Sequence, residues 1–212
     1  VYAGLLPGER TRLHSAYARA LTARPGLAGG SPAVAAAELA AHWEAAGDFP
    51  HALPAVVQAG RAAARSHAFP EAHRAYERAL ELWTRVPEPE SRTGVDQIEL
   101  LTRAAETAGF AGRPNRALML LTRALDGVDP AAEPMRAALL HMRLGDQSWV
   151  AGNEPGCLAA LADAVRILPP GPSTERARTI ASRCSRATAA RRCSSRRRQP
   201  PSRSGRPRRR RC

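Results

Sequence analysis

The side chains best suited to chemistry in this sequence are six histidines and four cysteines. Histidine and cysteine bind zinc or act in nucleophilic catalysis when the chain brings them together. His67 and His73 are six residues apart, unlike the i, i+4 histidine pair with a glutamate that zinc hydrolases carry on a helix. Cys184, Cys193 and Cys212 are nine and nineteen residues apart, which matches no usual zinc pattern. We therefore predict no metal and no cofactor.

Signatures of the common enzyme classes are also missing from the sequence. No lysine occurs anywhere, so the chain cannot contain the G-x-x-x-x-G-K-[ST] loop that cradles nucleotide phosphates. Ser66 precedes His67, but without the strand-to-helix turn that exposes a hydrolase nucleophile. No paired carboxylates and no nucleophile with an adjacent base emerge. The sequence favours a protein that binds other molecules and is not an enzyme.

The net charge of +13 is concentrated at one end of the chain. Residues 179–212 contain 13 arginines and no acidic residue, and no large apolar residue follows Ile180. Such a segment cannot bury enough apolar surface to order itself, so we predict a disordered tail. Its arginines could bind nucleic acid only non-specifically, because the segment has no aromatic residue for base stacking. Alternatively, the tail is the product of a shift in reading frame near residue 180, since out-of-register GC-rich codons yield this composition.

Before Ile180, apolar residues recur at helical spacing, and glycine or proline interrupts them every 15 to 20 residues or so. The pattern predicts helices at 7–24, 32–46, 50–66, 69–86, 95–110, 114–127, 133–151, 154–168 and 173–181. Strand signals are absent. No uncharged apolar run reaches the length of about 18 residues that a membrane span needs, so we predict a cytoplasmic protein without membrane contact.

Four of these helices share an internal repeat, in which a bulky apolar residue follows a small residue by four positions and an alanine follows three positions later. The copies are Ala52/Val56/Ala59, Ala72/Tyr76/Ala79, Ala117/Leu121/Ala124 and Cys157/Leu161/Ala164. Three copies begin five residues after a glycine, namely Gly47, Gly112 and Gly152, and His67 takes this place before the second copy. Glycine ends a helix readily because it adopts the left-handed conformation. Each copy therefore predicts the second helix of a closely packed hairpin.

The first hairpin also matches the tetratricopeptide pattern in its first helix. Leu39, Ala40 and Trp43 fall where that repeat has its leucine, small and aromatic residues, and Pro169 follows the fourth copy as in that repeat. The copies are spaced by 20, 45 and 40 residues, which departs from the regular 34, so we expect helix 50–66 to be shared between two hairpins. The sequence thus predicts an all-α, tetratricopeptide-like α-solenoid of helical hairpins with a disordered Arg-rich C-terminal tail.

The inner helices of such an array form a groove, which we expect to take a protein segment or a small effector. Trp43 and Tyr76 fill core positions of the repeat. Trp83 and Trp149 lie outside the repeat pattern, so they are our candidates for groove contacts, with core packing as the other interpretation.

Three stretches resemble the LuxR-type family of large bacterial transcriptional regulators. Residues 1–14, VYAGLLPGERTRLH, are similar to the end of the ATPase module of that family. Residues 37–48, AELAAHWEAAGD, and 72–83, AHRAYERALELW, are similar to the helical repeats that follow the module. In this family the repeats sense an effector or contact a protein, and a C-terminal helix-turn-helix binds DNA.

The resemblance implies a fragment from the middle of such a regulator, without its own ATPase or DNA-binding module. Residues 1–30 would end the ATPase module, residues 31–178 would form the repeats, and the tail would follow. The missing modules of the parent protein would then be its partners. The alternative is a free-standing tetratricopeptide scaffold for protein–protein interaction.

Overall fold

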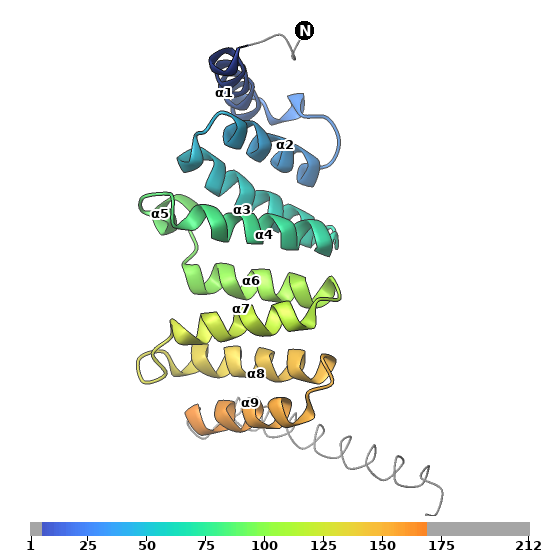
Figure 1. Cartoon of the computed structure of the whole chain (residues 1–212), viewed down its shortest axis with the longest axis vertical. Coiled ribbons are helices and arrows are strands. Elements are labelled where there is room, and N and C mark those ends of the chain that lie inside the picture. Colours follow the sequence, from blue (N-terminus) through green and yellow to red (C-terminus); the bar gives the residue numbers. More distant parts are fainter. Residues whose placement is uncertain (1–5, 169–212) are drawn as a thin grey trace, which may run out of the picture.

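The computed structural model describes residues 6–168, and this part of the chain is all-α, without a strand (Figure 1). The helices are α1 (Pro7–Ala23), α2 (Pro32–Ala45), α3 (Phe49–Arg65), α4 (Phe69–Trp83), α5 (Pro89–Thr93), α6 (Gln97–Phe110), α7 (Pro114–Asp126), α8 (Pro134–Val150) and α9 (Glu154–Ile167). Within the described range, no helix is both long and apolar enough to cross a membrane. The expectations for helix 173–181, Pro169, Cys184, Cys193, Cys212 and the tail fall outside the described residues, as do residues 1–5.

The helices predicted between residues 7 and 168 all form, and their ends lie within three residues of the predicted ones. Their starts have a simple cause, because a proline occupies the first or second position of every α-helix listed above except α6. Proline has a backbone φ suited to a helix and lacks the N–H group that would be left unbonded there. The sequence did not predict the five-residue α5 or a 3-10 turn at Pro25–Leu27, since neither is long enough to show a period.

Four hairpin turns form at the predicted positions. Gly47, Gly112 and Gly152 have φ angles of 72°, 74° and 76°, and His67, the predicted substitute, has a φ of 60°. In each turn the next residue donates its backbone N–H to a carbonyl five positions earlier, as Ala68 does to Ala63 at 2.9 Å. This bond is typical of helices that end with a left-handed residue. The glycine signal therefore located the turns, including the one where histidine stands in its place.

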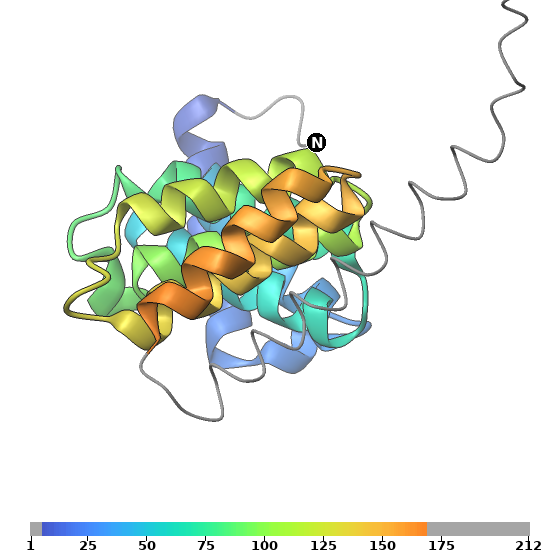
Figure 2. The same cartoon turned by 90° about the horizontal axis from the view of Figure 1, so that it is seen from below.

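The helices stack in chain order across the long axis of the molecule (Figure 1), and the later hairpins lie over the earlier ones when viewed along that axis (Figure 2). Helix α3 packs against both α2 and α4, with the turns at Gly47 and His67 at its two ends. It is therefore the second helix of one hairpin and the first helix of the next, as the spacing of 20 residues predicted. The pairs α6/α7 and α8/α9 are separate hairpins, and α4 packs against α6.

The residues of the internal repeat are buried in the core of the protein. All twelve residues of the four copies are less than a tenth exposed: Ala52, Val56, Ala59, Ala72, Tyr76, Ala79, Ala117, Leu121, Ala124, Cys157, Leu161 and Ala164. Ala40 and Trp43 are buried as well, and Leu39 is half-buried against the same core. Alanine and cysteine are small enough to let neighbouring helix backbones approach closely. The repeat is thus the pattern through which the hairpins pack together.

Trp83 corrects one expectation. This side chain was a candidate for a groove contact, with core packing as the other interpretation, and it is 7% exposed and belongs to the main core with Leu82 and Val86. The repeat pattern ends at Ala79, whereas the buried face of α4 continues for one more turn. Position outside the repeat was therefore the wrong guide to exposure.

Candidate functional site

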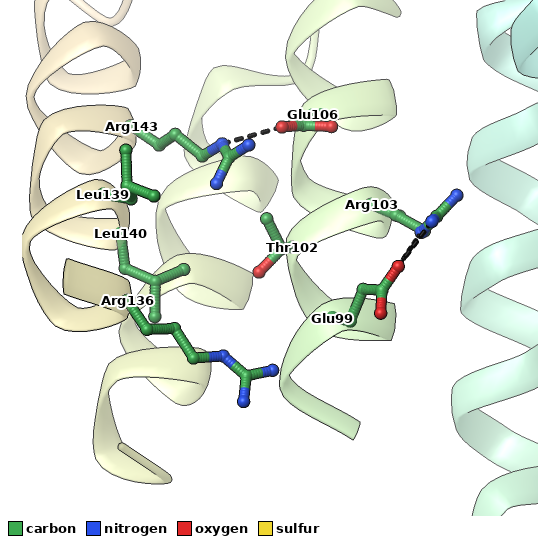
Figure 3. A pocket seen from close by; sticks show the side chains of 8 residues that line it. All are labelled: Glu99, Thr102, Arg103, Glu106, Arg136, Leu139, Leu140 and Arg143. Atoms are coloured by element: carbon green, nitrogen blue, oxygen red, sulfur yellow. Dashed lines mark hydrogen bonds and ion pairs between the residues drawn. The ribbon is translucent and has the colours of Figure 1, made fainter. Parts of the chain in front are cut away.

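Two adjoining hollows lie between α6 and α8, the first helices of the last two hairpins, and together they form what we call the groove. The large hollow measures about 500 Å³ and is lined by Glu99, Thr102, Arg103, Glu106, Arg136, Leu139, Leu140 and Arg143 (Figure 3). The small hollow measures about 230 Å³ and is lined by Glu106, Phe110, Leu121, Arg143, Asp146 and Gln147. Glu106 and Arg143 belong to both hollows.

Helical spacing places these side chains on one face of each helix. On α6, Glu99, Arg103, Glu106 and Phe110 follow one another at intervals of three or four residues. The opposite face of α6 is apolar and packs in the core through Leu100, Leu101, Ala104, Ala105 and Ala108. The lining of the groove on α8 has the same spacing, from Arg136 to Gln147. Two rigid elements therefore present the groove residues toward each other.

Ion pairs hold the two walls of the large hollow together. The Nε atom of Arg143 on α8 lies 2.7 Å from Oε1 of Glu106 on α6, and this contact spans the groove (Figure 3). Arg103 pairs along α6 with Glu99. Because both glutamates are bound to guanidinium groups, neither is placed to act as a general base.

Arg136 and Asp96 form a second link between α8 and the start of α6. The Asp96 carboxylate accepts the backbone N–H of Glu99 at 2.7 Å and pairs with the guanidinium of Arg136, which also reaches Glu133 at 3.1 Å. Burial by itself would raise the pKa of Asp96, but these hydrogen bonds hold the pKa below its ordinary value. Asp96 therefore stays ionised, capping α6 while it holds α8.

The small hollow has a different character. The Phe110 ring is 69% exposed and stacks on Phe69 with a centroid distance of 4.6 Å. Asp146 has no ion pair or hydrogen bond within the described part of the chain, and burial by neighbouring atoms raises the pKa of its carboxyl, against the opposing charge of Arg143. The Oε1 atom of Gln147 is buried and has no hydrogen-bond partner. This hollow thus combines an aromatic surface with an exposed carboxylate and one buried acceptor that has no partner.

Charged side chains of α4 form ion pairs with the neighbouring helices α2 and α7. Glu77 accepts two hydrogen bonds from Arg116 on α7, at 2.8 and 2.6 Å. Arg78 reaches Glu44 on α2 at 2.6 Å. These pairs connect α4 to its neighbours. Glu77, Arg78 and Arg116 also line a further hollow of about 510 Å³ between α4 and α7.

The histidines lie apart from the groove. His14 and His42 approach each other between α1 and α2, with their Nδ1 atoms 2.8 Å apart. His51 bonds to Asp48 at the start of α3, and His73 is buried in α4. Across residues 6–168, no three histidine, cysteine or acidic side chains form a group that could hold a metal ion.

Apart from Leu121, which belongs to the repeat, the groove residues were missed by the sequence analysis. The recognised repeat lies on the second helix of each hairpin, whereas the other groove residues lie on α6 and α8, where no motif was found. Trp149, the other expected groove contact, is half-buried on α8 and lines neither hollow. The available signal was the series of charged residues at helical spacing on α6 and α8. No protein-family model matches the chain, and no curated protein matches its sequence.

Proposed function

We propose that this chain is the effector-sensing or protein-interaction region of a LuxR-type, ATP-dependent transcriptional regulator that acts in the cytoplasm. The groove between α6 and α8 is the observation that carries the proposal, because it offers charges, a hydroxyl group and apolar side chains to a ligand on two rigid helices. The resemblance of residues 1–14, 37–48 and 72–83 to that family supports the choice of parent protein.

A ligand in the groove could change how the hairpins stack. The pairs Arg143–Glu106 and Arg136–Asp96 both span the gap between α6 and α8, so a ligand that competes for these groups changes the contacts between two hairpins. Each hairpin packs on the next, so a change at one interface alters the position of everything beyond it. A ligand that favours one arrangement would shift the population toward it and so act on the modules of the parent protein.

A binding screen on the full chain tests the binding part of this proposal. Peptides and small effectors would be screened by thermal shift, and each hit would be retested with Arg143→Ala. We expect this variant to weaken the hit, because Arg143 lines both hollows. Arg19→Ala, which removes an exposed arginine from α1, should leave binding unchanged. Hits that are equally affected by both variants would contradict a site in the groove.

The coding sequence upstream tests the choice of parent protein. A P-loop motif encoded in frame before residue 1 would support the regulator. A groove that binds peptides, with no such motif upstream, would instead favour the free-standing tetratricopeptide scaffold. The other two reading frames beyond residue 180 test the frame-shift hypothesis, which fails if neither continues the helical pattern.

A further inference from the structure

The contact between Arg143 and Glu106 divides the groove into two parts that differ in their charged groups. On the side of the large hollow lie Arg103, Arg136 and a single further carboxylate, that of Glu99. On the side of the small hollow, Asp146 is the remaining charged residue of the lining. The small hollow therefore holds one carboxylate, that of Asp146, without an arginine partner among its lining residues.

The two ends also differ in how far their polar groups are satisfied. Every charged residue that lines the large hollow has an ion-pair partner, so a new anion there would have to displace a carboxylate. In the small hollow, the Asp146 carboxylate and the Gln147 Oε1 atom have no partner within residues 6–168. The Gln147 Oε1 atom is buried, and a buried acceptor without a donor costs free energy, whereas Asp146 is exposed and offers an unpaired carboxylate to a cation.

The position of the Gln147 amide depends on a missing side chain. A Cβ atom built on Gly109 of α6 would lie 2.5 Å from Oε1 and 2.6 Å from Nε2 of Gln147. Any larger residue at this position would push the amide away. The absence of a side chain at Gly109 thus lets the unsatisfied oxygen of α8 lie against α6, beside the small hollow.

The remaining walls of the small hollow select the type of cation. Phe110 provides an exposed aromatic surface, which suits an organic cation on an aliphatic stem better than a hydrated metal ion. The Phe110 ring is held by its stacking on Phe69, and most of its surface stays exposed. A cation over an aromatic face gains further attraction from the ring.

We propose that the small hollow binds the basic side chain of a peptide segment, a lysine or an arginine, with its charged group at Asp146 and Gln147 and its stem on Phe110. The inference rests on the groove being a binding site, as proposed above. A peptide is the favoured source of the cation because the small hollow opens beside the large one, where the exposed Leu139 can contact a neighbouring residue of the same segment.

The test is an NMR titration of the full, ¹⁵N-labelled chain with two matched peptides. The first is acetyl-Ala-Ala-Lys-Ala-Ala-amide, and the second has norleucine in place of lysine, which removes the ammonium group and keeps the stem. We expect the lysine peptide to shift the Gly109 backbone signal and the Gln147 side-chain amide signals, and the norleucine peptide to bind more weakly. Diaminopentane, a free amine with a stem of similar length, serves as a third probe.

Variants connect the binding to the proposed groups. Asp146→Asn should raise the dissociation constant of the lysine peptide about threefold, as expected for a partly exposed charge pair. Gln147→Glu should lower it, because it adds a negative charge at the same place. Asp126→Asn, which removes an exposed carboxylate at the end of α7, is the matched control and should change nothing.

Three results would overturn the inference. Equal binding of the lysine and norleucine peptides would exclude a cation site. Diaminopentane binding as tightly as the lysine peptide would show that the hollow takes free amines and gains nothing from a peptide. A ligand found in the screen that shifts signals around Arg136 and Leu139 but not Gly109 or Gln147 would leave the proposed function intact and remove this inference alone.

Discussion

The ring of Tyr76 lies directly against Gly60, across the interface between α4 and α3. A Cβ atom built on Gly60 would lie 2.7 Å from the ring carbon Cε1 of Tyr76, which is closer than two carbon atoms can approach without movement. The last hairpin repeats the arrangement, because a Cβ on Gly145 of α8 would lie 3.1 Å from Cγ of Leu161 on α9. In both hairpins the bulky residue of the repeat therefore packs over a glycine of the preceding helix.

This contact predicts that Gly60→Ala destabilises the protein. The ring of Tyr76 is 1% exposed and cannot move aside into solvent, so the added methyl group must shift α4 relative to α3. We expect the free energy of unfolding to fall by about 1–3 kcal/mol, measured by denaturant unfolding. Gly8→Ala is the control, because no atom lies within 4 Å of its added Cβ and alanine favours a helix. Similar effects of the two substitutions would show that close packing at Gly60 is not required.

Because His67 has a left-handed backbone conformation, we predict that glycine at this position makes the protein more stable. His67 has a φ of 60°, and a side chain in this conformation costs about 1–2 kcal/mol. His67→Gly and His67→Ala both lose the edge contact of the ring with Phe69, so their difference isolates the backbone. We expect the glycine variant to be more stable by about 1 kcal/mol in thermal unfolding.

Replacing glycine by alanine at an equivalent turn checks the prediction for His67. Gly112 has a φ of 74° and no atom within 4 Å of an added Cβ. Gly112→Ala should therefore destabilise the chain by about 1 kcal/mol through the backbone alone. If alanine is tolerated at both positions without loss, the left-handed conformation does not limit the stability of these turns.

The hairpins were predictable because their signals are local. A turn residue such as Gly112 and the repeat residues Ala117 and Leu121 lie within ten positions of one another, so spacing alone predicts the turn and the buried face. The groove depends on contacts that have no local signal. Arg136 and Asp96 are 40 residues apart, and nothing in the sequence pairs them.

The choice of tryptophans failed for a related physical reason. Trp83 became a candidate for the groove, beside core packing, because it lies beyond the repeat, but burial on α4 follows the packing of α4 on its neighbours and not the length of a motif. The repeat copies identified the second helices, so the side chains that line the groove on the first helices needed the structure. The relation of Gly109 to Gln147 is of the same kind, since it depends on how α6 and α8 lie against each other.

Removing the Asp96 carboxylate should destabilise the protein through the loss of two separate interactions. This side chain caps α6 through the N–H of Glu99 and also holds Arg136 of α8. Asp96→Ala should lower the free energy of unfolding by about 1–2 kcal/mol. Asp96→Asn keeps a capping oxygen and should lose less. The control Asp48→Ala removes a cap at the start of α3, where the N–H of His51 lies 3.3 Å away, and a contact with the His51 ring on the same helix, but no link to another helix. An equal loss for Asp96→Ala and Asp48→Ala would show that the link to α8 adds nothing.

The buried histidine His73 predicts a loss of stability in mild acid. Burial lowers the pKa of His73 below its ordinary value of 6.5, with Glu77 opposing this and the charges of Arg113 and Arg116 adding to it. The unfolded chain therefore binds a proton more readily, so the free energy of unfolding falls as the pH drops below about 6.5. The pKa of Glu77 is also lowered, first by its hydrogen bond from Arg116, which extends the loss below about pH 4.5.

Denaturant unfolding at a series of pH values between about 8 and 5 measures this slope. His73→Leu replaces the buried imidazole with an apolar side chain. It should flatten the upper part of the plot of unfolding free energy against pH. His51→Leu is the control, because it removes an exposed histidine by the same substitution. His141, whose pKa burial also lowers, should leave part of the slope in the His73 variant. An unchanged curve in His73→Leu would contradict the role given to His73.

The Asp146 carboxylate predicts opposite effects on stability and on binding. Burial raises its pKa, so the folded chain holds the proton more tightly than the unfolded chain does. The contribution of this group to stability is present below its ordinary pKa of 3.8 and is lost as the pH rises through the folded-state value. Asp146→Asn should consequently raise the free energy of unfolding at neutral pH, and the gain should vanish in strong acid.

The same substitution should weaken the lysine peptide, so one change would stabilise the fold and impair the site. This combination is expected of a side chain retained for binding, because binding groups are often held in surroundings that disfavour them. Asp163→Asn is the control for the same chemical change. It removes an ion pair with Arg166 at 2.7 Å, so it should not raise the free energy of unfolding. If Asp146→Asn instead destabilises the chain at neutral pH, the carboxylate has a stabilising partner in the protein. That result would contradict an unpaired carboxylate available to a ligand.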